Sequence, residues 1–455
     1  MPVSLEEPAA APGPRGHWLL GSLAPLRDDP LGFLLDSAAQ FGDVARFRAF
    51  TQRGYILRHP EHIQRVLVDN HRNYNKQSRG FKVVAQFLGN GLLTSEGSFW
   101  LRQRRLMQPA FHRERLAGLS SIMNDEAQAC AERLKPKARS GEEFNIAAEM
   151  MRLTLRVVSR SMLGAEISGA EETVERSMAV ILAYGMRRIS NPLLDVLPAR
   201  STRRFNKAVA DMDALVHGII AARRAKSASP SAEGDLLSML MEARDEDTGE
   251  VMDDRQLRDE VMTMFTAGHE TTANALAWTF LLLAQNPEAE ARLRQELSSV
   301  LRGRAPALED LPRLTYLSCV LKESLRIYPP AWVSSRLSIG PDEMGRFRIA
   351  PGCLILVSPY LTHRHPALWP EPERFRPERF LEPATAELPR YAYFPFGGGP
   401  RQCIGNGFAL MEAQIVLAAL LQRFRLELVP GRAVEPEPLI TLRPRGGLWV
   451  RARPA

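Results

Sequence analysis

Long apolar runs are missing from this chain of 455 residues. A helix that crosses a membrane needs about 20 consecutive apolar residues. The longest apolar stretches, such as Ala275–Ala284, are much shorter. The first residues are rich in proline and lack the apolar segment of a secretion signal. We therefore expect a cytoplasmic protein without a membrane span.

Cysteines and basic tracts are also scarce. The four cysteines form no C-x-x-C pair, which argues against a zinc cluster or a disulfide framework. The net charge is +7, but Lys and Arg alternate with Asp and Glu along most of the chain. Nucleic-acid binding usually needs a concentrated basic patch, so we expect no nucleic-acid partner.

The spacing of apolar residues predicts a mainly α protein with a minor β part. Apolar residues recur at intervals of three and four from about residue 60 to 300, as in helices. Residues 43–58 and 346–358 alternate as strands do. Residues 1–30 form a proline-rich lead-in, and the Ser- and Pro-rich segment 227–234 is predicted to be a loop rather than a domain linker.

One cysteine stands in an unusual setting. The segment F-P-F-G-G-G-P-R-Q-C-I-G, residues 394–405, places Cys403 in a glycine-rich loop before an apolar helix predicted at 406–424. Glycines let a backbone pass close to a flat ligand. Backbone amides, the helix start and the charge of Arg401 should lower the pKa of the thiol and favour a thiolate metal ligand. The alternative is a buried structural cysteine.

This loop resembles the haem-binding loop of the cytochrome P450 family, F-x-x-G-x-R-x-C-x-G. Phe396, Gly399, Arg401, Cys403 and Gly405 fill its fixed positions. The resemblance implies haem b (iron protoporphyrin IX) as cofactor, with Cys403 as the axial ligand of the iron and Phe396, Arg401 and Gly405 beside the haem. A cysteinate ligand favours cleavage of the O–O bond. The resemblance also implies the cytochrome P450 fold, in which a long central helix lies over the haem and the cysteine loop lies beneath it.

A long helix is predicted from Asp254 to the stop at Asn286-Pro287. In its centre stands A-G-H-E-T-T, where Gly268 costs about 1 kcal/mol of helix stability relative to alanine. The hydroxyl of Thr271 can bond back to the carbonyl of Ala267 and bend the helix, which would open a groove there.

The same block resembles the family motif [AG]-G-x-[DE]-T-T. The resemblance implies that Ala267 and Gly268 lie against the haem and that Glu270 and Thr271 are an acid–alcohol pair. Thr271 would then hydrogen-bond bound dioxygen, and Glu270 would relay protons from solvent. The alternative is a surface glutamate beside two ordinary threonines. His269 falls on the variable position of the motif and is predicted to have no catalytic role.

A structural network and the anchors of the haem carboxylates are implied in the same way. K-E-S-L-R places Glu323 and Arg326 on one helical face. The resemblance adds Arg379, from F-R-P-E-R-F, to a Glu-Arg-Arg triad that holds the fold. Arginine is well suited to bind the haem carboxylates. The positions that match the family here are Trp100, Arg104, Arg336 and Arg401. The alternative is that the arginines are solvated surface residues. The apolar residues aligned with the substrate walls, each of which could instead be ordinary core, are Leu92, Leu93, Ala267, Ala331, Val333 and Ile440.

Together these motifs predict a haem-thiolate monooxygenase. It would use O₂ to hydroxylate or epoxidise a lipophilic small molecule, with a fatty acid or a terpenoid as the favoured class. The motifs run from Trp100 to Gly405, so residues 1–455 are predicted to be one domain without a fused reductase. Electrons would come from a separate ferredoxin or flavodoxin-type donor with its NAD(P)H reductase. The alternatives are a haem sensor or carrier without turnover and a peroxide-driven enzyme. Neither needs the acid–alcohol pair Glu270-Thr271.

Overall fold

The computed structural model describes residues 10–167, 169–191, 194, 200–226, 235–244, 249 and 251–455. The loop predicted at 227–234 lies outside these residues, as does the start of the proline-rich lead-in, residues 1–9. The described part of the lead-in is not wholly extended, because it contains the short helix α1 (Leu23–Asp28).

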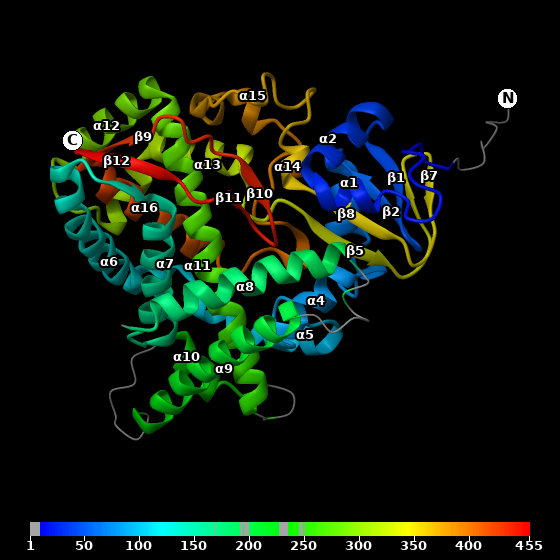
Figure 1. Ribbon diagram of the computed structural model, residues 1–455, viewed down its shortest axis with the longest axis horizontal. Coiled ribbons are helices and arrows are strands. Elements are labelled where there is room, and N and C mark those ends of the chain that lie inside the picture. The colour runs from blue at the N-terminus through cyan, green and yellow to red at the C-terminus, as the bar shows by residue number, and fades with distance from the viewer. Residues whose placement is uncertain are drawn as a thin grey trace.

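Helices make up most of the molecule, as predicted (Figure 1). The longer ones are α6 (Arg113–Ser140), α7 (Ile146–Leu163), α8 (Glu171–Ser190), α9 (Arg200–Lys226), α11 (Asp254–Gln285), α12 (Pro287–Leu301), α13 (Thr315–Ile327) and α16 (Asn406–Leu421). The shorter ones are α2 (Pro30–Phe41), α3 (Pro60–Gln64), α4 (Arg79–Leu88), α5 (Gly97–Met107), α10 (Leu236–Glu242), α14 (Pro359–Thr362) and α15 (Pro383–Ala386).

Helix α11 is the predicted long helix; it runs through the middle of the fold and packs against α7, α13 and α16 (Figure 1). Asp253 caps its start by accepting a hydrogen bond from the backbone N–H of Gln256 at 2.7 Å. Pro287 follows its end. Most of its side chains are buried, which explains why the segment Ala275–Ala284 near its end is apolar except for Thr279.

The β part is small. The main sheet has the order β1-β2-β8-β5-β3, in which only β2 and β8 run parallel. Its strands are β1 (Val44–Ala49), β2 (Gln52–Leu57), β8 (Leu354–Val357), β5 (Ser334–Ser338) and β3 (Tyr74–Asn75). The hairpin predicted at 43–58 is therefore confirmed. The strand pattern at 346–358 belongs to two strands, β7 (Phe347–Ile349) and β8, because a turn at Gly352 separates them.

Three smaller sheets complete the fold. They contain β4 (Glu143–Asn145), β12 (Trp449–Pro454) and β9 (Phe424–Leu428); β6 (Asp342–Met344) with β7; and β10 (Pro436–Pro438) with β11 (Leu442–Pro444). The predicted class, mainly α with a minor β part, is confirmed. One cluster of buried apolar side chains extends from Leu31 to Ala452, as a single domain would require, although the one-domain organisation stays a prediction.

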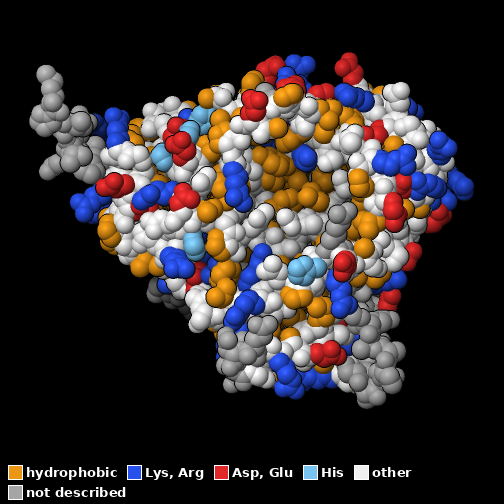
Figure 2. Space-filling view, turned by 180° about the vertical axis from the view of Figure 1, so that it is seen from behind, with side chains coloured by type: hydrophobic (Ala, Val, Ile, Leu, Met, Phe, Trp, Pro, Cys, Tyr) orange, Lys and Arg blue, Asp and Glu red, His pale blue; other side chains and the backbone are white. Residues whose placement is uncertain are grey.

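The surface mixes both signs of charge. Figure 2 shows Lys and Arg interspersed with Asp and Glu over one face, around an apolar area near its middle. Within the described ranges, no helix combines the length and the apolar character that a membrane crossing requires.

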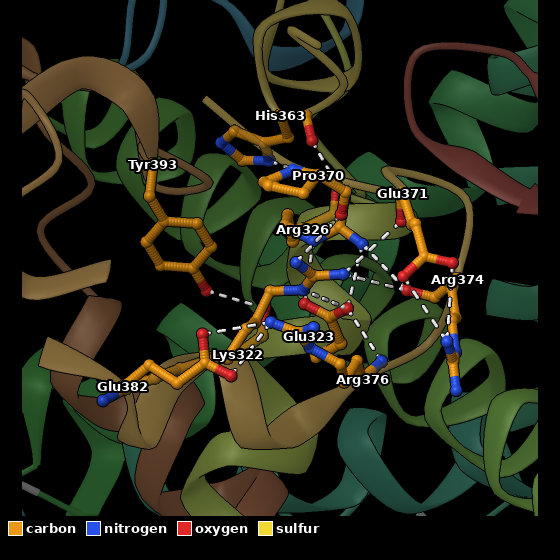
Figure 3. Close-up of polar contacts among 11 residues, drawn as sticks. Lys322, Glu323, Arg326, His363, Pro370, Glu371, Arg374, Arg376, Glu382 and Tyr393 are labelled. Carbon is orange, nitrogen blue, oxygen red and sulfur yellow. Dashed lines mark hydrogen bonds and ion pairs between the residues drawn. The ribbon is translucent and has the colours of Figure 1, made fainter. Parts of the chain in front are cut away.

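The Glu-Arg-Arg network lies in the interior (Figure 3). Arg326 Nε and Nη2 donate to the two carboxylate oxygens of Glu323 at 2.7 and 2.9 Å, one helical turn away on α13. Arg379, from a short 3-10 helix at Pro377–Leu381, donates to Glu323 Oε1 at 2.9 Å. The backbone N–H of Arg376 adds a fourth donor at 3.0 Å. All three charged residues are buried, so the network fastens the segment around residue 376 to α13.

Replacing Glu323 by alanine should leave two arginines buried without their carboxylate. We expect a loss of about 3–5 kcal/mol in the free energy of unfolding and poor retention of haem. Thermal unfolding and the haem-to-protein ratio measure both. Glu132→Ala is the control, because Glu132 pairs with Lys135 on the surface and such pairs contribute less than about 1 kcal/mol. Equal losses in the two variants would contradict a structural role of the network.

Candidate functional site

A cavity of about 850 Å³ lies between the middle of α11 and the cysteine loop. Every residue predicted beside the haem or the substrate lines this cavity: Leu92, Leu93, Trp100, Arg104, Ala267, Gly268, Glu270, Thr271, Ala331, Val333, Arg336, Phe396, Arg401, Cys403, Gly405 and Ile440. Glu323, Arg326 and Arg379 are not among the lining residues, in keeping with a structural role.

The conformation of the cysteine loop depends on two backbone contacts, one with the segment around Leu67 and one within the loop. Gly399 has φ of +64°, and a Cβ on it would lie 1.8 Å from the carbonyl oxygen of Leu67. A larger residue at 399 would therefore push the loop away from the segment around Leu67. The backbone N–H of Cys403 donates to the carbonyl of Phe396 at 3.0 Å, which turns the chain toward the start of α16. The loop thereby holds the Cys403 thiol at the cavity wall, where its side chain is accessible.

The expected low pKa of Cys403 is not found. Although the side chain is accessible from the cavity, the surrounding protein desolvates the thiol, and this raises its pKa by more than the N–H of Gly405 and the charge of Arg104 lower it. The cation expected to help, Arg401, points elsewhere: its guanidinium donates to the carbonyl of Ser95 at 2.8 Å and lies 3.8 Å from the centre of the Trp100 ring. Arg104 is the nearby cation, bonded to the carbonyl of Gln402 at 2.9 Å. A metal ion would therefore displace the thiol proton on binding.

Positive charge collects in one part of the cavity. Arg336 and Arg401 are largely enclosed, and burial lowers the pKa of each to about 10. Lys76 is buried as well, and burial followed by the charges of Arg336 and Arg401 lowers its pKa well below its usual value. Glu96 pairs with Arg401 at 2.8 Å. Buried cations are costly unless anions neutralise them, so this donor set fits the two carboxylates of a haem.

Sequence reasoning missed Lys76 and Glu96. Lys76 belongs to no motif, and nothing near either residue in the sequence connects it with the cations of the cavity. Their importance depends on contacts with distant segments. Lys76 Nζ donates to the carbonyl of Leu93 at 3.0 Å, and Glu96 accepts from the backbone N–H of Lys76 at 2.7 Å.

The opposite wall is the centre of α11. The hydroxyl of Thr271 donates to the carbonyl of Ala267 at 2.8 Å, which is the predicted back-bond. Ala267, Gly268 and Thr271 are open to the cavity. His269 is buried and does not line the cavity, with Nδ1 placed 2.6 Å from the carbonyl oxygen of Phe265.

Glu270 is buried but reaches the cavity wall. Its carboxyl accepts a hydrogen bond from the hydroxyl of Thr441 at 2.5 Å, and Asn274 Nδ2 donates to that hydroxyl at 3.2 Å. Burial raises the pKa of Glu270 to about 7, although Thr441 and Arg443 lower it. A carboxyl with such a pKa can both accept and release a proton near neutral pH. Thr441 was not predicted, because no sequence signal connects it with Glu270.

Comparison with known proteins agrees with this geometry. Residues 11–449 match the family described as Cytochrome P450. Cyclooctatin synthase of Streptomyces melanosporofaciens is 39% identical over 432 residues, which cover 94% of this chain and 92% of that protein. Cyclooctat-9-en-7-ol 5-monooxygenase of the same organism is 38% identical, covering 91% and 88%. Pentalenene oxygenase of Streptomyces avermitilis is 34% identical, covering 91% and 90%.

These matches extend over nearly the whole chain, well beyond the motifs recognised in the sequence. They confirm the predicted family, the predicted haem b cofactor and the predicted monooxygenase activity. The cavity has the Cys403 thiol on one wall, Glu270 and Thr271 on the other, and Lys76, Arg104, Arg336 and Arg401 among its lining residues. The chain belongs to the cytochrome P450 family and is a haem-dependent monooxygenase.

Proposed function

We propose that this enzyme inserts one atom of O₂ into a lipophilic terpenoid. The observation that supports this most directly is the cavity between Cys403 and the Ala267–Thr271 segment, whose remaining walls are largely apolar. Such walls favour a substrate with few polar groups. The similar enzymes named for cyclooctatin, cyclooctat-9-en-7-ol and pentalenene point to the terpenoid class.

A fatty acid, the other predicted class, receives less support. Its carboxylate would need a free cation away from the haem carboxylates. Arg79 also lines the cavity, but its guanidinium donates to the backbone oxygens of Arg188 at 2.7 Å and Ile189 at 3.3 Å.

Each part of the cavity has a distinct role in this proposal. Cys403 would bind the haem iron, and Lys76, Arg104, Arg336 and Arg401 would neutralise the haem carboxylates. Haem bound through a cysteinate supplies the activation of O₂. Leu92, Leu93, Ala331, Val333 and Ile440 would hold the substrate by apolar contact and exclude water.

Proton delivery would fall to Glu270 and Thr271. In this structure Glu270 bonds to Thr441, and Thr271 bonds to the carbonyl of Ala267, so the two side chains do not bond to each other. Glu270 would release Thr441 and turn toward the cavity to pass on its proton, while the Thr271 hydroxyl would donate to bound dioxygen.

Electrons would come from a ferredoxin or flavodoxin-type protein with its NAD(P)H reductase. Exposed Arg105 and Arg390 could contact such an acidic partner. Arg105 lies on α5, next to the Arg104 that touches the cysteine loop. Arg102 on the same helix is less accessible to a partner, because its Nε and Nη2 atoms are buried. If the rate at which the acidic partner reduces the enzyme does not fall with rising salt, the partner does not bind at this surface.

The cytoplasmic location and the lack of a nucleic-acid partner stay predictions.

The substrate class is tested by titrating the haem-loaded enzyme with cyclooctat-9-en-7-ol, pentalenene and, as the contrasting class, palmitic acid. At least one terpenoid should shift the haem from low to high spin with a Kd about tenfold or more below that of the fatty acid. Turnover under ¹⁸O₂ should add one labelled oxygen atom to the product. A tighter fatty-acid complex would contradict the terpenoid assignment, and turnover only with hydrogen peroxide would favour the peroxide-driven alternative.

The role of Cys403 is tested by Cys403→His. The reduced, carbon monoxide-bound enzyme should show the Soret band typical of thiolate ligation, and the variant should lack it even where haem remains bound. Cys319→Ser is the control, because Cys319 is buried on α13 outside this cavity. Persistence of the thiolate band in Cys403→His would rule out Cys403 as the ligand.

The role of Glu270 predicts a pH dependence. With a pKa of about 7, its carboxyl is protonated below that pH and loses the proton to be delivered as pH rises. Product formation per NAD(P)H should therefore fall above about pH 7. Thr441→Val removes a hydrogen bond that lowers this pKa, so the inflection should move to higher pH. Glu270→Gln should abolish the inflection and slow product formation about 100-fold. An inflection at the same pH in Thr441→Val and wild type would show that another group is responsible.

A further inference from the structure

The loop formed by residues 89–95 lies directly on the first half of α11. Leu92 and Leu93 of this loop line the cavity. Gly89 has φ of +72°, and a Cβ on it would lie 2.0 Å from Asp259 Oδ1. A Cβ on Gly91 would lie 2.4 Å from Thr263 Oγ1 and 2.6 Å from the carbonyl oxygen of Asp259. The backbone of the loop therefore touches the helix with no room for a side chain.

Two consecutive acids on α11 bind the backbone of this loop. Asp259 Oδ2 accepts from the N–H of Asn90 at 2.7 Å, and Glu260 Oε2 accepts from the N–H of Leu92 at 2.9 Å. Both acids are buried, and Glu260 has no exposed surface. A buried backbone N–H needs a partner, and each of these two amides has a carboxyl group as its partner.

The other end of the loop is fastened to the haem side. Lys76 Nζ donates to the carbonyl of Leu93 at 3.0 Å, and Arg401 Nη1 donates to the carbonyl of Ser95 at 2.8 Å. Inside the loop, the Thr94 hydroxyl donates to the carbonyl of Gly89 at 2.7 Å. The loop is thus compact and fixed at both ends, with the two leucines between the fixed points.

Arg258, the residue before the two acids, extends this network to other helices. Its Nε donates to Asp213 Oδ1 on α9 at 2.8 Å, and its Nη2 donates to the carbonyl of Phe87 near the end of α4 at 2.9 Å. Its Nη1 donates to Asp259 Oδ1 at 2.9 Å. Three consecutive residues of α11 therefore hold α9, α4 and the loop.

We propose that Asp259 and Glu260 are positioning residues that set the selectivity of the cavity by clamping Leu92 and Leu93 against the substrate. Neither acid lines the cavity, so both act through the loop. The selectivity part of this inference rests on the proposed function, whereas the clamp itself does not.

The state of Glu260 suggests an informative pair of variants. Oε1 is buried without a hydrogen-bond partner. Burial raises the pKa of Glu260 to about 8, and the neighbouring charge of Asp259 raises it further while the N–H of Leu92 lowers it. The carboxyl is then mostly protonated at neutral pH, so glutamine has nearly its shape and charge and keeps the accepting oxygen. Alanine removes the acceptor and leaves the Leu92 amide unpaired.

The experiment compares Glu260→Ala, Glu260→Gln and Glu126→Ala in the haem-loaded enzyme at pH 7. Glu126 is also a buried glutamate, but it pairs with Arg160 and does not line the cavity. Hydrogen exchange of the peptide covering residues 89–95 reports the clamp without any substrate. The ratio of oxidised products, or the Kd from the spin shift, reports selectivity for the best terpenoid.

We expect Glu260→Ala to speed exchange of this peptide about tenfold, since a lost buried hydrogen bond commonly has an effect of this size. The product ratio should change as well. Glu260→Gln should keep the exchange rate of the peptide and the product ratio close to those of the wild type, and Glu126→Ala should change neither. Normal exchange in Glu260→Ala would overturn the clamp. Faster exchange with an unchanged product ratio and Kd would overturn its role in selectivity.

Gly91→Ala is the second variant, should Glu260→Ala fail to fold. It leaves both acids intact but forces the loop away from Thr263, so it should produce the same faster exchange and altered product ratio. Wild-type behaviour of a folded Gly91→Ala enzyme would overturn the inference. If no terpenoid binds the wild-type enzyme, the proposed substrate class is wrong, while the exchange measurement still decides the clamp.

Discussion

Four segments that are far apart in the chain bring positive charge to the same part of the cavity. Lys76 follows β3, Arg104 lies on α5, Arg336 on β5 and Arg401 just before Cys403. Glu96 offsets part of this charge. Water is largely excluded there, so the arrangement is favourable only when an anionic ligand completes it. Haem bound there as proposed would be a structural component as well as a catalyst, because its carboxylates would join segments that otherwise repel one another.

The loop at 89–95 accepts hydrogen bonds from two of these cations and connects the two sides of the cavity. Its carbonyls accept from Lys76 and Arg401, whereas its amides donate to acids on α11. The haem side and the oxygen side are therefore linked through a few hydrogen bonds of one short loop. Two of the apolar side chains proposed to face the substrate, Leu92 and Leu93, belong to the same loop, so substrate shape and cofactor binding would be physically related here.

Motifs with short spacing could be predicted from the sequence. Cys403 in its glycine loop, the centre of α11, and Glu323 with Arg326 each depend on residues within a few positions, and helical or turn geometry fixes their relation. Contacts between distant segments could not be predicted in this way. Glu270 with Thr441, and Glu260 with Leu92, join residues more than 160 positions apart. The direction of Arg401 was also missed, because nothing near it in the sequence shows that its guanidinium contacts Glu96 and Trp100.

A Cβ added at Gly399 would lie only 1.8 Å from the carbonyl oxygen of Leu67. This close contact has a consequence for building chimeric enzymes. The cysteine loop packs directly against the backbone of residues 65–69. A loop transplanted into a relative will therefore fit only where that distant segment has a compatible shape. A crossover that takes residues 394–405 from one parent and 65–69 from another joins surfaces shaped for different partners. Libraries that inherit both segments together should yield more functional recombinants than libraries that separate them.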